Sequence, residues 1–317
     1  MTAARDSNSA QSKQVVVALG SVDEGLVRPI LGDGCELVTN PTDADLSIAV
    51  GALVRGNVIV SRETFDTMPN LRVLARTGVG TERVDLAAAT ERGIPVVITP
   101  GSNTRAVAEG ALAMMLALTK SLAALDAVVR EGRWSDRESV PVGDIDGSTV
   151  GIVGYGRIGQ RLSELLVTLG AEVIAFDPVA VVPDSMRCDT LADLLGRSSI
   201  VSLHVPLLES TRHMINAAAL NSMPTGAILV NCGRGPLVDL DAALVALESG
   251  QLGGIALDVF DDEPPTPHAL FQHPRTLLTP HVMGLSRKSA AQTYIDAARG
   301  IRLVLAGGTA QATANNV

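Results

Sequence analysis

Short apolar runs recur along the first hundred residues, with polar or helix-forming segments between them. We predict strands at residues 14–19, 35–39, 46–50, 58–60, 71–75 and 95–99. Residues 84–91 have the apolar spacing of a helix. Strands that alternate with helices are typical of an α/β domain with a mostly parallel sheet. Thr99-Pro100-Gly101 interrupts this pattern, so we place the end of a first domain near residue 100.

The next stretch, from Thr104 to about Glu131, has the apolar pattern of one long helix rich in Ala, Leu and Met. A helix this apolar needs cover on more than one face. It can pack between two domains, or part of it can form the interface of a homodimer, which we favour.

Beyond this helix the alternation resumes with six more strand-like runs. They lie at residues 149–153, 172–176, 200–205, 227–232, 254–260 and 276–279, and helical stretches such as 240–248 separate them. This pattern predicts a second, doubly wound parallel sheet. A last helix is predicted at residues 290–305, and because no strand follows it we expect it to return to the first domain. The expected domains are therefore 1–100 plus 285–317, and 101–284.

The first strand of the large domain runs directly into Gly154-Tyr155-Gly156-Arg157-Ile158-Gly159, and a helical pattern follows. In such a G-x-G-x-x-G stretch Gly154 allows a tight turn, Gly156 leaves room for a pyrophosphate, and Gly159 lets helix and strand pack closely. The helix N-terminus then faces the phosphates. Asp177 ends the next strand, where a carboxylate binds ribose hydroxyls and repels a 2′-phosphate. The stretch predicts a site for NAD, in preference to NADP.

Composition argues against several other functions. The formal charge of −9 and the pI near 5.1 argue against nucleic acid or anionic membranes as partners. Cys35, Cys188 and Cys232 have neither disulfide nor metal-ligand spacing, so we expect a cytoplasmic protein without a bound metal. Residues 1–13 are polar, and we expect a loose tail there and no signal peptide. No apolar run approaches the roughly 20 residues of a membrane span.

Three polar residues follow predicted strands of the large domain: Arg234, Glu263 and His281. Parallel strands present their carboxyl ends at one edge of a sheet, so these side chains can meet in one crevice. An arginine can bind a carboxylate through two hydrogen bonds. A histidine can give or take a hydroxyl proton, and a carboxylate beside it can orient its ring. The set predicts hydride transfer between NAD and a 2-hydroxy or 2-oxo acid.

Taken together, these motifs resemble the NAD-dependent D-2-hydroxyacid dehydrogenase family over nearly the whole chain. The matching stretches are Gly78-Val79-Gly80 with Asp85, residues 154–159, 203–207, 231–235 and 258–264, and Thr279-Pro280-His281. The resemblance implies a flavodoxin-like substrate domain and a Rossmann NAD-binding domain, with the active site in the cleft between them. It also implies that Arg234 binds and polarises the substrate, that His281 is the acid/base, and that Glu263 is its partner.

The same resemblance implies the remaining contacts. The backbone amides of Val79 and Gly80 would hold the substrate carboxylate. The residues implied to contact NAD are Gly154, Gly156, Arg157, Ile158, Gly159, Asp177, Pro206, Cys232 and Asp258. Cys232 is then a packing residue beside the nicotinamide, because no base is paired with it as a nucleophile would require.

Within the family, the chain is most similar to the D-3-phosphoglycerate dehydrogenases. Arg55 and Arg76 stand where that subgroup carries arginines for a substrate phosphate, and the alternative is that they are solvated strand-end residues. Met283, where many relatives have Gly, and Gly56, where a hydroxyl residue is common, depart from the pattern. Glyoxylate, hydroxypyruvate and sulfolactate therefore stay open as substrates. The chain ends soon after its last helix, so we expect no separate C-terminal regulatory domain.

Two alternative functions belong to proteins of the same architecture. An NAD-sensing transcriptional corepressor would use the fold as a binding protein, but the sequence carries neither a long disordered tail nor a basic patch. A formate dehydrogenase would carry an amide in place of the Glu263 carboxylate.

Overall fold

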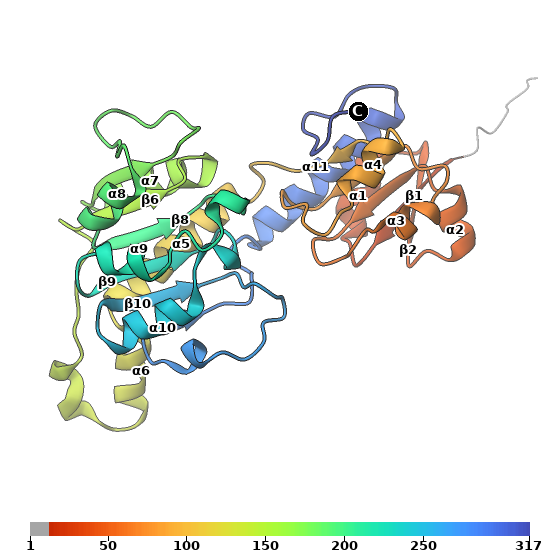
Figure 1. The fold of residues 1–317 in the computed structure, drawn as a ribbon. Helices are drawn as coiled ribbons and strands as arrows, with labels where there is room; N and C mark the ends of the chain where they lie inside the picture. The colour runs from red at the N-terminus through yellow and green to blue at the C-terminus, as the bar shows by residue number, and fades with distance from the viewer. Residues whose placement is uncertain (1–12) are drawn as a thin grey trace, which may run out of the picture. The chain divides into compact units, whose positions relative to one another are not determined.

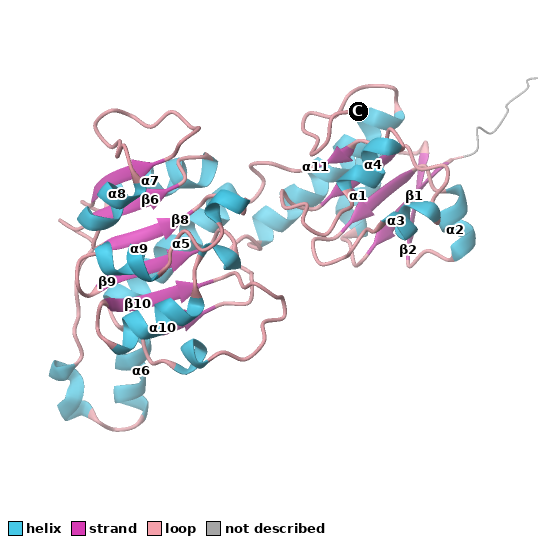
Figure 2. Cartoon of the chain, viewed as in Figure 1, coloured by secondary structure: helices cyan, strands magenta, loops and turns pink. Residues whose placement is uncertain are grey.

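The chain forms two α/β domains, each built on a parallel sheet (Figure 1). The computed structural model describes residues 13–317, so residues 1–12 of the tail predicted over residues 1–13 lie outside the described part. The small domain comprises Met1–Asn103 with Arg287–Val317, and the large domain comprises Thr104–Ser286. Helices cover both faces of each sheet (Figure 2). The predicted fold class, two doubly wound parallel sheets, is confirmed.

The small-domain sheet has the strand order β2-β1-β3-β4-β5, which is the flavodoxin-like order. Its strands are β1 (Gln14–Leu19), β2 (Cys35–Thr39), β3 (Gly51–Val54), β4 (Val73–Arg76) and β5 (Val96–Val97). Its helices are α1 (Glu24–Leu31), α2 (Asp43–Ile48), α3 (Arg62–Asp66), α4 (Leu86–Glu91) and α11 (Arg287–Leu305). Two apolar clusters fill the two faces of this sheet, one around Val17 and Leu74 and the other around Val16 and Ile301.

Two of the predicted strands in this domain were wrong. Most of residues 46–50 lies in or next to helix α2, because Thr42 and Asp45 form a reciprocal capping box that starts a helix there. The strand begins later, at Gly51, where a β-carbon would come within 3.1 Å of Ile301 in α11. Residues 58–60 form only a single bridge, between Val60 and Val84.

The end of the chain protects the open edge of the small sheet. The backbone N–H of Ile98 donates to Ala312 and that of Ala314 donates to Val96, beside β5. The side chain of Asn315 accepts a hydrogen bond from Val96 N–H and donates one to the carbonyl of Ile94. An exposed strand edge is a site of unwanted pairing, so this segment serves as its cover.

The large-domain sheet has the order β11-β10-β9-β8-β6-β7, with all neighbouring pairs parallel. Its strands are β6 (Thr149–Val153), β7 (Glu172–Phe176), β8 (Ile200–Leu203), β9 (Ala227–Asn231), β10 (Leu252–Leu257) and β11 (Thr276–Leu278). Its helices are α5 (Thr104–Thr119), α6 (Leu122–Arg130), α7 (Arg157–Thr168), α8 (Leu191–Arg197), α9 (Ala217–Ser222) and α10 (Leu240–Glu248). The chain leaves β6 for β7 on one side and returns to β8 on the other, so the switch point of the sheet lies at the carboxyl end of β6.

The predicted single helix over residues 104–131 is in fact two helices, α5 and α6, bent by 56° at the break between them. Ser121 at this break has the left-handed φ of 49° and donates its hydroxyl to the carbonyl of Pro141. Among the described residues, no single helix is long and apolar enough to cross a membrane, and only this bent pair would be so by length and composition.

Candidate active site and cofactor-binding site

The three glycines of the fingerprint turn have different structural tasks. Gly154 has φ of 97°, and a β-carbon built there would lie 2.7 Å from the carbonyl carbon of His204. A β-carbon on Gly159 would lie 2.1 Å from the carbonyl oxygen of Gly154, so helix α7 packs directly on the turn. A β-carbon on Gly156 would meet no atom within 4 Å. Folding therefore requires glycine at 154 and 159, whereas Gly156 leaves an open space above the turn.

That open space lies at the N-terminus of helix α7. Gly156 is the N-cap residue, and no side chain caps the helix. The first N–H groups of the helix and its positive dipole end are therefore available to an anion. Arg157, the first residue of the helix, is exposed. A backbone cradle without a β-carbon, uncapped N–H groups and an adjacent cation together fit the pyrophosphate of NAD.

Asp177, which follows β7, organises the same turn. Its carboxylate accepts hydrogen bonds of 2.8 Å from the backbone N–H groups of Tyr155, Val179 and Ala180. Burial alone would raise the pKa of Asp177, but these three donors outweigh it and lower the pKa below its ordinary value. The ionised carboxylate therefore connects the glycine turn to the loop beyond β7, where sequence reasoning expected only a ribose contact.

Four more residues were predicted to contact the cofactor. Pro206, Cys232 and Asp258 each lie shortly after the carboxyl end of a strand, and Ile158 lies in the first turn of helix α7. Pro206 is exposed on the loop after β8, and Ile158 packs against the core beneath the turn. Cys232 follows β9 and is buried, with its Sγ 3.8 Å from the Sδ of Met114. Burial, together with the negative charge of Asp258, raises the pKa of Cys232 to about 12. The thiol stays protonated, which agrees with a packing role and not with a nucleophile.

Asp258 follows β10, and its carboxylate, only 3% exposed, holds the loop after β11. It accepts a hydrogen bond of 2.7 Å from the Thr279 hydroxyl and bonds of 2.9 and 3.2 Å from the N–H groups of Val282 and Met283. These contacts lie on both sides of His281. From the sequence, Asp258 was predicted only to contact the cofactor, and its hydrogen bonds to this loop were not predicted. The Thr279-Pro280-His281 motif, whose threonine hydroxyl donates to Asp258, could have pointed to them.

His281 and Glu263 form a direct pair in the large domain. The imidazole Nδ1 lies 2.8 Å from both carboxylate oxygens of Glu263. The His281 side chain is 50% exposed and that of Glu263 is 30% exposed, so the ring is accessible while its partner is more enclosed. Phe260, Phe271, Leu278 and three prolines line a cavity of about 460 Å³ next to the pair.

Arg234 lies on the loop after β9, and its Nη1 donates to the carbonyl of Gly233 at 2.8 Å. The next residue, Gly235, packs so closely on the loop after β10 that a β-carbon there would lie 2.0 Å from the carbonyl carbon of Phe260. The loop that carries Arg234 therefore touches the segment that leads to Glu263. The large domain thus brings the Arg234 loop, Glu263 and His281 to the same end of its sheet.

The small domain holds the other predicted residues. Arg55 follows β3 and Arg76 ends β4, in register beside Val54. Arg76 is 6% exposed and donates to the carbonyl of Gly56 at 2.8 Å. Arg55 donates to the Ser21 hydroxyl at 2.8 Å and lies 3.5 Å from the Tyr294 hydroxyl. The two arginines thus lie at the carboxyl ends of neighbouring strands, where Arg76 is buried and Arg55 is partly exposed.

The predicted carboxylate-binding amides lie on the loop between β4 and α4. Val79 is 44% exposed, and over residues 13–317 no side chain or carbonyl accepts from the N–H of Val79 or Gly80. The far end of the loop is fixed by backbone hydrogen bonds of 2.8 and 2.9 Å that link Val60 to Arg83 and Asp85.

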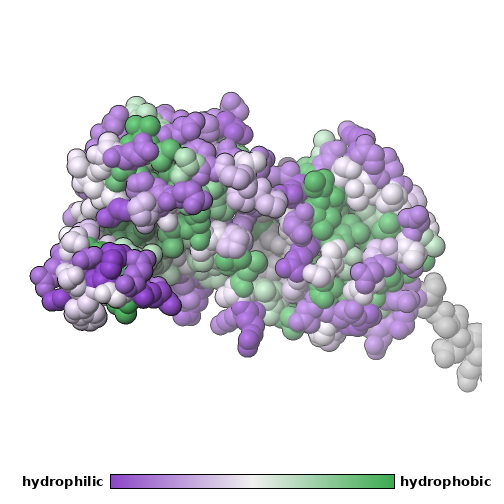
Figure 3. Space-filling view, turned by 90° about the horizontal axis from the view of Figure 1, so that it is seen from below, coloured by the Kyte–Doolittle hydropathy of each residue, from purple (hydrophilic) through white to green (hydrophobic). Residues whose placement is uncertain are grey.

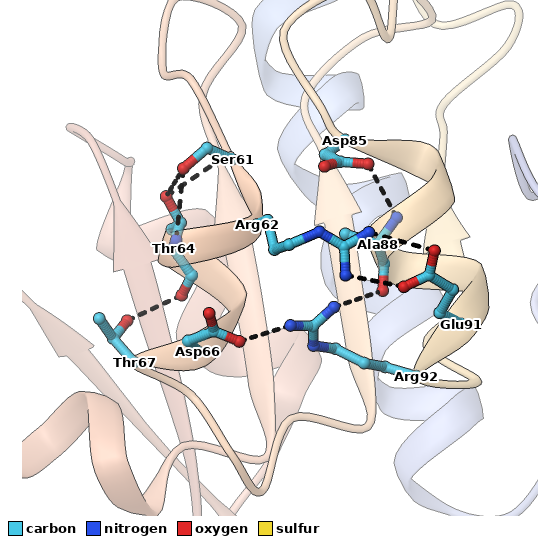
Figure 4. Close-up of polar contacts among 9 residues, drawn as sticks. All are labelled: Ser61, Arg62, Thr64, Asp66, Thr67, Asp85, Ala88, Glu91 and Arg92. Carbon is cyan, nitrogen blue, oxygen red and sulfur yellow. Dashed lines mark hydrogen bonds and ion pairs between the residues drawn. The ribbon is translucent and has the colours of Figure 1, made fainter.

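Two ion pairs join helix α3 to helix α4, the helix that follows this loop (Figure 4). Arg62 pairs with Glu91, and Arg92 pairs with Asp66. Arg92 also donates to the carbonyl of Ala88 at 3.0 Å, and Asp85 caps α4 by accepting from the N–H of Ala88 at 2.8 Å. The loop that carries the two free amides therefore runs between a fixed strand end and a fixed helix start.

Comparison with known proteins identifies the family. A sequence model described as "D-isomer specific 2-hydroxyacid dehydrogenase, NAD binding domain" matches residues 112–283. A D-3-phosphoglycerate dehydrogenase of Mycobacterium tuberculosis is 38% identical over 287 residues, which are 87% of this chain and 54% of that protein. The chain thus spans about half the length of this curated relative.

Two further proteins show the range of names among its relatives. A glyoxylate reductase of Thermofilum pendens is 37% identical over 78% of this chain and 76% of its own length. The crystal structure of a D-lactate dehydrogenase from Aquifex aeolicus, complexed with NAD and lactic acid, superposes with a TM-score of 0.81 at 26% identity, covering 93% of this chain and 96% of that one. The chain therefore belongs to the D-isomer specific 2-hydroxyacid dehydrogenase family, and its large domain is the NAD-binding domain of that family.

Proposed function

We propose that the protein is an NAD-dependent oxidoreductase that interconverts a D-2-hydroxy acid and its 2-oxo acid. The observation that carries this proposal is the 2.8 Å pair of His281 and Glu263 at the end of an NAD-binding sheet. When bound, NAD accepts or donates the hydride at the substrate C2. The protein supplies the proton transfer and the binding of the acid.

The geometry of the pair assigns the proton-transfer atom. Because Nδ1 of His281 is held by Glu263, Nε2 is the nitrogen that gives a proton to the C2 oxygen during reduction and takes it back during oxidation. Glu263 fixes the orientation of the ring. Arg234 binds the substrate carboxylate and polarises the neighbouring carbonyl, as a guanidinium can do through two parallel hydrogen bonds.

The substrate that fits best is a small acid with a second anionic group, such as 3-phosphoglycerate. Arg55 and Arg76, at the carboxyl ends of β3 and β4, place two positive charges on a protein of net charge −9. Relatives named D-3-phosphoglycerate dehydrogenase support the same choice. Glyoxylate, hydroxypyruvate and sulfolactate are the alternatives, and relatives named glyoxylate reductase and hydroxypyruvate reductase support the first two.

Steady-state kinetics test the function directly. The oxidation of NADH and of NADPH is followed with 3-phosphohydroxypyruvate, hydroxypyruvate, glyoxylate, 2-oxoglutarate and sulfopyruvate, and kcat/KM is compared across the panel. We expect the highest value with 3-phosphohydroxypyruvate and NADH. A protein that binds NADH tightly but reduces none of these acids would contradict the enzymatic function and favour an NAD-sensing one.

Substitution of Arg55 separates the substrate classes. Loss of one charge-assisted hydrogen bond costs about 1.5–3 kcal/mol, so Arg55→Ala should lower kcat/KM for 3-phosphohydroxypyruvate by roughly 10- to 100-fold and change that for glyoxylate little. Arg72→Ala, at an exposed arginine just before β4, is the matched control and should leave both values unchanged. Equal losses on both substrates would make Arg55 a structural residue, held by Ser21.

We also propose that the protein is a cytoplasmic homodimer. Helix α6 and the following 3₁₀ segment η1 (Trp134–Ser139) expose three large apolar side chains, Leu122, Val129 and Trp134, by 54–64% (Figure 1). A partner subunit could cover these side chains. Elsewhere, on the face drawn in Figure 3, hydrophobic patches are interspersed with hydrophilic residues on both domains. Light scattering should give twice the chain mass of 32.8 kDa, and Trp134→Ser should shift the protein toward that single-chain mass. Fractionation of the source cells tests the location.

A further inference from the structure

The loop after β11 holds His281 in an unusual backbone conformation. His281 has φ of 54°, in the left-handed region that few non-glycine residues occupy. Its N–H donates to the carbonyl of Thr279 at 3.0 Å, and the N–H of Leu285 donates to Val282 at 2.9 Å. Such a conformation persists only where the surroundings hold it. The contacts that hold this loop therefore decide where the imidazole lies.

One set of contacts is made by the backbone of the loop to Asp258, as described above. The other set is made by the side chain of Met283, two residues beyond His281. A β-carbon built on Gly110 of helix α5 would lie 2.6, 2.7 and 2.9 Å from the Sδ, Cβ and Cγ atoms of Met283. Met283 therefore lies directly on the bare backbone of α5 at Gly110.

Neither helix α5 nor the loop that carries Met283 can move freely at this contact. On the α5 side, Ala108, Ala111 and Met114 are at most 2% exposed, so the helix is fixed in the core of the domain. On the loop side, the N–H of Met283 is held by Asp258, and the Cβ of Met283 itself is among the atoms that any larger residue at position 110 would meet. A side chain at 110 must therefore move the backbone of the loop, and not only the flexible end of the methionine.

We propose that Met283 is a positioning residue: its contact with Gly110 links the His281 loop to helix α5 and so determines where His281 lies. The side chain of Met283 fits at this place because position 110 has no β-carbon. The proposal rests on the function proposed above for His281, but the geometry that it asserts can be measured without turnover.

A double-mutant cycle tests it, with Gly110→Ala, Met283→Gly and the two together. Because a displacement of about 1 Å at a reacting group can cost on the order of 100-fold, Gly110→Ala should lower kcat by roughly 10- to 100-fold. The Kd for NADH should stay within about 2-fold of the parent, since the glycine turn is untouched. In the Met283→Gly background the alanine at 110 should have no further effect, because the side chain that it displaces is gone.

The matched control is Gly196→Ala in helix α8. A β-carbon there would meet only the Ser222 carbonyl, at an ordinary 3.6 Å, so the same substitution in a helix should change neither kcat nor NADH binding. Thermal unfolding of all four variants separates a local shift from a loss of the fold. Parental kcat in Gly110→Ala, or an equal loss of kcat with and without Met283, would overturn the proposal.

A crystal structure of Gly110→Ala gives the readout that does not depend on activity. We expect the His281 Nδ1 to have moved away from its 2.8 Å contact with Glu263. If His281 keeps this contact and its φ near 54°, the positioning role is refuted even if the parent enzyme turns over none of the acids tested. If only the proposed function is wrong, the parent protein will reduce none of the acids, but His281 will still move in the Gly110→Ala structure.

Discussion

Substitution of Gly156 by alanine should separate cofactor binding from folding. The β-carbon of an alanine at 156 would meet no protein atom within 4 Å, so the protein itself has room for it. It would occupy the space above the N-terminus of α7, where the pyrophosphate of NAD fits. The neighbouring Gly159→Ala is the matched contrast, because its β-carbon would lie 2.1 Å from the Gly154 carbonyl oxygen.

The structure sets the expected magnitudes. For Gly156→Ala, reduced freedom of the unfolded chain stabilises by about 0.4–1 kcal/mol, and alanine is a poorer N-cap than glycine by a similar amount. The net change in the free energy of unfolding should therefore stay within about 1 kcal/mol, a shift in Tm of roughly 2–4 °C at most for a domain of this size. Gly159→Ala should cost about 1–3 kcal/mol or more, because backbone atoms must move to admit the methyl group. The Kd for NADH should rise by roughly 10- to 100-fold in Gly156→Ala, about 1.4–2.8 kcal/mol.

Two measurements on the purified variants are needed. NADH fluorescence titration gives the Kd, and thermal unfolding followed by circular dichroism without cofactor gives the Tm. A Gly156→Ala variant that binds NADH like the parent would refute the inference that the space above the turn receives the pyrophosphate. A loss of Tm as large as that of Gly159→Ala would refute the assignment of separate tasks to the two glycines.

The remaining predictions concern single titratable residues. His281→Ala should lower kcat by roughly 10²- to 10⁴-fold and leave the NADH Kd unchanged, and half-parental turnover would remove His281 from the proton-transfer step. Asp177→Asn should weaken NADH binding, relax the discrimination against NADPH and lower Tm. The folded state lowers the pKa of Asp177 below 3.8, so the Tm difference between parent and variant should be present above pH 3.8. This difference should shrink as the pH falls through the folded pKa. A Tm difference that is constant from pH 3 to pH 7 would show that the charge of Asp177 does not matter. Burial lowers the pKa of His204 from 6.5 to about 4, so the unfolded state binds more protons between these values and the free energy of unfolding should fall by up to about 3 kcal/mol from pH 6.5 to pH 4. His204→Gln should remove most of that decrease, as urea titrations over this pH range would show.

Local pattern predicted most of the fold because each strand in a parallel sheet is a short apolar run between breaks. The strands of the large domain and helix α10 lie where the periodicity placed them. Two of the wrong predictions, the strand at 46–50 and the single helix at 104–131, concern apolar stretches that are divided between two elements or lie next to a second one. Residues 46–50 were predicted as a strand, but a capping box at Thr42 starts helix α2 there, and the strand β3 begins only at Gly51. The long helix broke at Ser121 because of a hydrogen bond to Pro141, twenty residues away in the sequence.

The candidate site could be predicted as a set of residues but not as an arrangement. Residue type and position after a strand made Arg234, Glu263 and His281 candidates, and the family resemblance supplied their expected roles. In the structure Glu263 and His281 follow the neighbouring strands β10 and β11 and form a pair. The second task of Asp177, which ties the glycine turn to the next loop, depends on where backbone N–H groups point. The direction of a backbone N–H group cannot be predicted from the residue types alone.

The sequence by itself determined the elements, the glycine turn and the chemical groups, because these follow from periodicity and from residue types a few positions apart. Only the tertiary structure decided which groups support one another. Gly110 and Met283 are far apart in the chain, and their fit depends on a β-carbon that is absent from one helix. Asp258 was predicted only as a cofactor contact, and the tertiary structure adds three hydrogen bonds by which its carboxylate holds the loop after β11. Such long-range contacts form when the sheet brings distant loops together at one edge, and no local pattern encodes them.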